Sequence, residues 1–146
     1  MRVGAGVDLL MAPPGNEATD EGFGIGVRSR LAIPLTYEVS LGLGAGISGS
    51  VHQGRSRATY AFNTQASLIV TFPQEEDTTW WPYVLAGAGG YVPLRGDATG
   101  GPALHGGIGW SRLLEEASVY VEFDPTLVIS RSSSSGIFAL RGGVIF

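Results

Sequence analysis

Apolar residues alternate with small or polar residues along most of this chain. In the stretch "VSLGLGAGISGSV", Val39, Leu41, Leu43, Ala45 and Ile47 are apolar, and the positions between them are glycine or serine. A period of two is the pattern of a β-strand whose two faces differ. The same alternation recurs in the segments around "RVGAGVDLL", "FGIGVRSRLAI" and "GIFALRGGVIF". The pattern therefore predicts an all-β protein.

Eight such segments follow one another, separated by turn-like stretches such as "PLTYE" and "SRSSSSG" that are rich in proline, glycine and serine. The segments are about 10 to 17 residues long, against about 5 to 6 for an ordinary strand. An even number of consecutive antiparallel strands favours an up-and-down barrel, because closure removes exposed sheet edges. We predict one domain, residues 1–146, that forms an eight-stranded antiparallel barrel.

Composition indicates which face of this barrel points outward. The chain has no lysine and only 15% charged residues, whereas soluble domains average about 25%. A barrel in water would expose its polar face, but here that face consists mainly of glycine and serine. A transmembrane barrel exposes its apolar face to lipid and closes its polar face inward. We therefore predict a transmembrane β-barrel, and a soluble ligand-binding barrel is the main rival for the fold.

Charged residues at inward positions form the first candidate site. A charge in a narrow lumen is costly unless it is paired, and arginines and acids occur there in matching numbers. The sequence predicts a lumen ion-pair network of Asp8, Arg28, Arg30, Glu122, Asp124 and Arg141. One interpretation is a plug that fills the barrel. The other is the polar lining of a narrow pore.

Aromatic residues gather near the predicted strand ends. All three tryptophans fall toward the end that would also hold both termini, which is typical of the aromatic belts at membrane interfaces. The predicted girdle consists of Tyr37, Trp80, Trp81, Trp110, Tyr120 and Phe146.

The eight alternating segments, the stretch "WPYVLAGAGGYV" and the terminal "LRGGVIF" resemble the small outer-membrane β-barrels of the outer-membrane protein A and X type. The resemblance covers the whole chain as architecture. It implies a monomer in the outer membrane of a double-membraned bacterium, with outer-membrane lipids as partners and both termini in the periplasm. It also implies that the C-terminal strand, ending in Phe146, is read by the barrel-assembly machinery.

We expect a structural or surface-interaction role rather than catalysis, with a narrow channel as one alternative. A lipid-modifying enzyme is the other alternative, because known eight-stranded barrels include lipid A acyltransferases and deacylases, and Ser50 and His52 share a face near one rim. No orienting acid is evident beside them. The tripeptide Arg95 to Asp97 reads "RGD", but Gly-Asp is ordinary turn chemistry.

The remaining composition narrows the candidate ligands. The chain contains no cysteine and two histidines, so we expect no metal site and no cofactor. The net charge of −4 and the absence of a basic cluster argue against nucleic acid as a partner.

Overall fold

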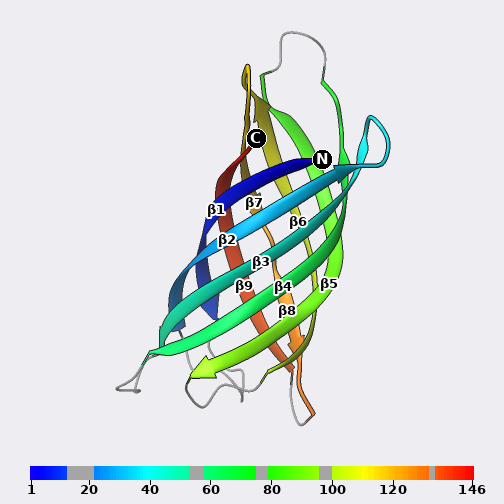
Figure 1. Cartoon of the computed structure of the whole chain (residues 1–146). Coiled ribbons are helices and arrows are strands. Elements are labelled where there is room, and N and C mark those ends of the chain that lie inside the picture. Colours follow the sequence, from blue (N-terminus) through cyan, green and yellow to red (C-terminus); the bar gives the residue numbers. More distant parts are fainter. Residues whose placement is uncertain (13–21, 53–57, 75–78, 96–99, 132–133) are drawn as a thin grey trace.

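The computed structural model describes residues 1–12, 22–52, 58–74, 79–95, 100–131 and 134–146, with only the backbone described at residue 52. These residues form one antiparallel sheet that curves into a barrel (Figure 1). Among them, no helix is long and apolar enough to cross a membrane. The strands are β1 (Arg2–Ala12), β2 (Gly22–Pro34), β3 (Val39–His52), β4 (Thr59–Thr71), β5 (Trp81–Arg95), β6 (Gly101–Leu113), β7 (Ser118–Phe123), β8 (Thr126–Ile129) and β9 (Ser134–Ile145).

The first and last strands close the barrel. β1 pairs with β9 in antiparallel register from Gly4 opposite Ile145 to Met11 opposite Phe138. The ladder extends to the last residue, because Val3 N donates to Phe146 O at 3.1 Å and Phe146 N donates to Val3 O at 2.8 Å. Blue β1 and red β9 accordingly lie side by side in Figure 1. Closure leaves no exposed sheet edge for another chain to pair with.

The seventh barrel strand is divided into β7 and β8 by Pro125, which has no N–H to donate to the ladder. The register with β6 is the same on both sides of the break, since Ile108 lies opposite Phe123 and His105 lies opposite Thr126. Asp124 N donates to Ala139 O at 2.8 Å across the break. The nine strand segments therefore form the closed eight-stranded barrel that the sequence predicts.

The burial pattern is the inverse of that of a soluble protein. In β2, Phe23, Ile25 and Val27 are exposed, and the alternate glycines and arginines, from Gly24 to Arg30, are buried. The other strands likewise turn most of their large apolar side chains outward, and within the described residues the buried apolar cluster consists of Ile69, Tyr83 and Leu85. The apolar residues of the alternating pattern thus form the exterior of the barrel, and the small and polar residues form its interior.

Close strand contact at Gly89 gives a test of the fold. A Cβ at Gly89 would lie 1.8 Å from the backbone oxygen of Thr64, whereas at the adjacent Gly90 the nearest atom is the Thr64 hydroxyl oxygen at 3.4 Å. We expect Gly89→Ala to lower the free energy of unfolding by at least about 1 to 3 kcal/mol, because the backbone at Thr64 must move away from the added methyl group. Urea unfolding of the refolded protein, followed by tryptophan fluorescence, measures this loss. Gly90→Ala is the matched control, and equal losses for both variants would contradict the close packing of β4 and β5.

Candidate functional site

Charged side chains from four neighbouring strands of the barrel meet inside its lumen. Asp8 comes from β1, Glu122 from β7, Arg141 from β9, and two arginines from β2. All of these side chains are buried, as is Asp124, which follows β7. Strand alternation explains this arrangement, because residues two apart on a strand share a face. The inward positions of four strands therefore deliver three arginines and three carboxylates to one layer, which we call the lumen network.

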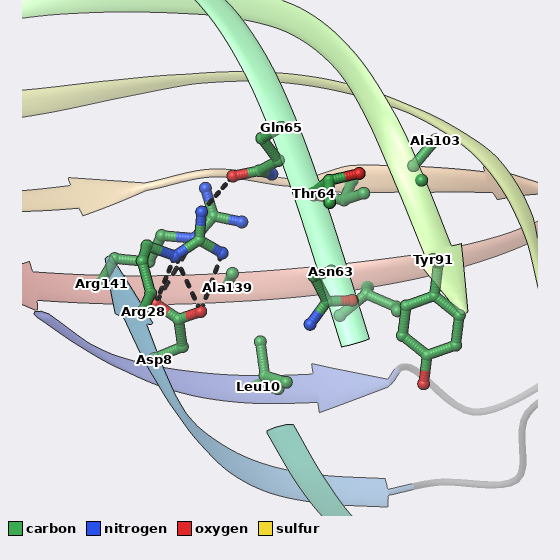
Figure 2. A pocket seen from close by; sticks show the side chains of 13 residues that line it. Asp8, Leu10, Arg28, Asn63, Thr64, Gln65, Tyr91, Ala103, Ala139 and Arg141 are labelled. Carbon is green, nitrogen blue, oxygen red and sulfur yellow. Dashed lines mark hydrogen bonds and ion pairs between the residues drawn. The ribbon is translucent and has the colours of Figure 1, made fainter. Parts of the chain in front are cut away.

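Asp8 and Arg28 form the first pair of the lumen network. Arg28 Nη2 lies 2.8 Å from Asp8 Oδ2, and Arg28 Nε donates to both carboxylate oxygens at 3.1 and 3.0 Å. The other side of the guanidinium donates to the side-chain oxygen of Gln65 on β4. Figure 2 shows Arg28 held between Asp8 and Gln65, with Arg141 beside them. The guanidinium group of Arg28 thus links β1 to β4 through the lumen.

Glu122 is the centre of the second group. Its Oε2 accepts from Arg30 Nη1 at 2.7 Å and from the Tyr83 hydroxyl at 2.8 Å, and its Oε1 accepts from Arg141 Nη1 at 3.5 Å. The guanidinium of Arg30 also lies 4.8 Å from the centre of the Tyr120 ring, a cation–π distance. Glu122 therefore joins β2, β5, β7 and β9 through one carboxylate.

Asp124 is the most deeply buried acid, with 0% of its surface exposed. It accepts from Arg141 Nη1, and both of its oxygens lie within 3.0 Å of His105 Nδ1. Gln65 Nε2 donates to it at 3.5 Å. Asp124 is an acceptor, so His105 carries its proton on Nδ1, and Nε2 accepts from the Ser67 hydroxyl at 3.2 Å. With His105 neutral, the lumen network holds three positive and three negative charges.

Ser67, His105 and Asp124 are ordered like the nucleophile, base and orienting acid of a hydrolase. The sequence pattern did not predict this hydrogen-bonded series. The described cavity that Ser67 lines has a volume of about 10 Å³. That is about the space of one water molecule, far below the volume of an acyl substrate. We therefore interpret the three residues as a hydrogen-bonded part of the lumen network.

The structure brings all six charged residues predicted from the sequence into one connected group. The sequence pattern assigned no role to Gln65, Tyr83 and Ser67, which join the network together with His105. Their place in the lumen could have been inferred from the alternation, since each lies an even number of residues from other inward-facing positions of its strand. The predicted pairing of Ser50 with His52 lies partly outside the described residues, because the side chain at position 52 is not described. Residues 96 and 97 of the "RGD" tripeptide also lie outside them.

Two residues of the predicted aromatic girdle are placed differently by the structure. Tyr120 is only 2% exposed and lies inside the barrel on the same face as Glu122, so its assignment to the girdle is wrong. Trp81 is half-buried and lines a cavity at one end of the lumen, so it does not face outward either. In both cases strand parity, rather than aromatic character, determines the direction of the side chain.

The other four girdle residues are exposed. Their exposed fractions range from 38% for Trp80 to 80% for Tyr37, and the list is completed by Trp110 and Phe146. Trp110 and Phe146 lie at or beside the strand ends that share one end of the barrel with both termini.

A closed eight-stranded barrel with an apolar exterior and a charge-paired lumen is the fold of small bacterial outer-membrane β-barrels. Neisserial surface protein A has this fold: it superimposes with a TM-score of 0.73 at 14% sequence identity, over 99% of this chain and 94% of its own.

Two further solved structures are similar. The N-terminal barrel domain of Pseudomonas aeruginosa OprF has a TM-score of 0.53 at 16% identity, covering 98% of this chain and 97% of its own. Ail, the attachment invasion locus protein of Yersinia pestis, has a TM-score of 0.56 at 11% identity, covering 99% and 97%. No protein-family model matches the chain, and neither does any curated protein. At these identities the similarity establishes the fold, and function rests on this chain's own residues.

Two buried tyrosines give a matched test of the lumen network. The Tyr83 hydroxyl donates to Glu122, whereas the Tyr120 hydroxyl is buried without a hydrogen-bond partner. We expect Tyr83→Phe to lower the free energy of unfolding by about 1 to 3 kcal/mol, because a hydrogen bond to a charged group is lost. We expect Tyr120→Phe to be neutral or slightly stabilising. Urea unfolding of both variants measures the difference, and the reverse order of stabilities would contradict the described network.

Proposed function

We propose that this protein is an integral barrel of a bacterial outer membrane with a structural or surface-interaction role. In this proposal it is a monomer, its apolar exterior contacts outer-membrane lipids, and both termini lie in the periplasm. The lumen network closes its interior, so the protein acts as an anchored scaffold rather than as a channel. Surface interaction then occurs at the end of the barrel opposite the termini.

The observation that carries the proposal is the apolar exterior. Val7, Val27, Ile47, Leu68 and Leu104 are each at least half exposed, and they lie on β1, β2, β3, β4 and β6. Soluble monomers rarely expose contiguous apolar surface beyond a few hundred Å², because it promotes association. Around a closed barrel, this surface is instead the expected match for hydrocarbon. The fold similarity to outer-membrane barrels supports the same location.

The lumen volumes favour a closed interior over the narrow-pore alternative. On either side of Arg28 and Arg141 the described cavities measure about 30 and about 10 Å³. These volumes hold one or a few water molecules. An ion crossing the barrel would have to displace paired arginines and carboxylates. We therefore propose that the network is a plug.

We further propose that the protein has no catalytic activity and no cofactor, and that the barrel-assembly machinery recognises its C-terminal strand. The strand β9 ends beside Phe146, which is 70% exposed and pairs its backbone with Val3. The lipid-modifying alternative is tested by incubating the protein with lipid A. Altered acyl chains that disappear in the His52→Ala variant would contradict the non-catalytic proposal.

Membrane insertion is the direct test of the proposed function. Protein unfolded in urea and diluted into phospholipid vesicles should co-float with the vesicles, resist protease over the strands and migrate faster in unheated than in heated gel samples. These results are expected because lipid replaces water around the apolar exterior. Charged substitutions at the exterior, such as Leu68→Arg, should impair insertion, while Ser130→Arg at a strand end serves as control. A protein that stays soluble and monodisperse without detergent or lipid would contradict the proposal.

A further inference from the structure

One large cavity lies at the end of the barrel that holds the termini and the short strand connections. Its volume is about 500 Å³, and we call it the vestibule. Residues that line it include Arg2, Arg30, Trp81, Tyr83, Ser118 and Tyr120. The vestibule lies on the side of the lumen network opposite to the cavity of Figure 2, and neither the structural role nor the closed lumen requires it.

The lumen network fixes the floor of the vestibule. Tyr83 and Arg30 are both hydrogen-bonded to Glu122, and Arg30 stacks on the Tyr120 ring. These three side chains are therefore held in place before any ligand enters. A rigid floor favours binding, because no side-chain freedom has to be lost on association.

The walls combine aromatic rings with hydroxyl groups. Trp81 continues the inner face of β5 above Tyr83, and Ser118 continues the inner face of β7 above Tyr120. Flat aromatic surfaces stack best on other rings, and hydroxyl groups donate to oxygen atoms. The volume also falls in the range of about 300 to 1,000 Å³ that is usual for small-molecule sites.

The charges of the vestibule have one sign. Among its described lining residues there are two arginines and no carboxylate. Glu122 lies beneath the floor, where Arg30, Tyr83 and Arg141 occupy its oxygens. At the mouth, exposed Arg2 contacts the Ser118 hydroxyl at 3.5 Å and forms no ion pair with the described residues. A guanidinium that has no carboxylate beside it, at the mouth of an aromatic cavity, is suited to a ligand carboxylate.

We infer that the vestibule binds a small aromatic carboxylate, with its ring between Trp81 and the tyrosines of the floor and its carboxylate at Arg2. This inference goes beyond the proposed structural role. It also explains why Trp81 faces inward, since its ring stacks on the ligand. The ligand enters from the side of the termini, which the proposed orientation makes the periplasm.

The probe for the test is 6-fluoro-2-naphthoate, followed by ¹⁹F NMR with the protein in zwitterionic lipid nanodiscs and with empty nanodiscs as background. Wild type should give saturable line broadening. Trp81→Ala should weaken the affinity about tenfold, since stacking and burial are lost. Arg2→Ala should weaken it at least about threefold, because an exposed charge contributes modestly.

Two matched controls sharpen the test. Trp80→Ala removes the neighbouring tryptophan, and Arg112→Ala removes an exposed arginine on the outer face of β6; neither residue lines the vestibule. Both variants should bind like wild type, and the neutral 6-fluoro-2-naphthamide should bind more weakly than the acid.

The inference is overturned if binding does not exceed that of empty nanodiscs, or if Trp81→Ala and Arg2→Ala bind like wild type. Displacement of the probe by octanoate at equal affinity would also overturn it, because the site would then select an aliphatic chain. The titration does not depend on the membrane. If the chain remains in solution, the same variants are titrated there, and the failure to insert bears only on the proposed function.

Discussion

The energetic requirement to pair charges inside a narrow barrel constrains the rest of this structure. A buried arginine or carboxylate without a partner costs several kcal/mol, and eight strands leave room for little more than side chains. Three arginines and three carboxylates meet this requirement together, with Gln65, Tyr83 and His105 taking up further hydrogen-bonding positions. Arg30 on β2 and Glu122 on β7 are separated by 92 residues, and β1 and β9 lie between their strands, so this pair forms only when the barrel closes. The network therefore specifies the closed topology as well as the contents of the lumen.

Closure and the apolar exterior depend on the same alternation of residues. Most inward polar positions have outward apolar neighbours, so pairing β1 with β9 completes both surfaces at once. Shifting any strand by one residue would turn its charges outward and its apolar residues into the lumen. Even at Pro125, where one donor is missing, the register continues from β7 into β8. The ion pairs and the exterior thus favour the same register.

Much of this architecture could be predicted from the sequence because a period of two carries direct information about strand faces. Asp8, Arg28 and Arg141 could be assigned to the interior from parity alone. The contacts of Arg28 with Gln65 and of Arg30 with Glu122 could not, since each joins strands that are not neighbours and depends on distances across the lumen.

The assignment of Tyr120 to the girdle is wrong because two features of the sequence indicated different faces of the strand. Parity placed it beside Glu122, whereas its aromatic ring suggested the membrane interface, and the structure follows parity. The vestibule was not predictable, because a cavity at one end of a barrel depends on how far side chains from every strand reach.

Planar-bilayer conductance tests the central claim, that paired charges close the lumen, most directly. Wild-type protein inserted in the bilayer should show no discrete current steps above background. The double variant Asp8→Ala with Arg28→Ala keeps the charge balance but removes two side chains of the plug, so it should show small steps. Regular steps from the wild type, equal to those of the double variant, would contradict the account.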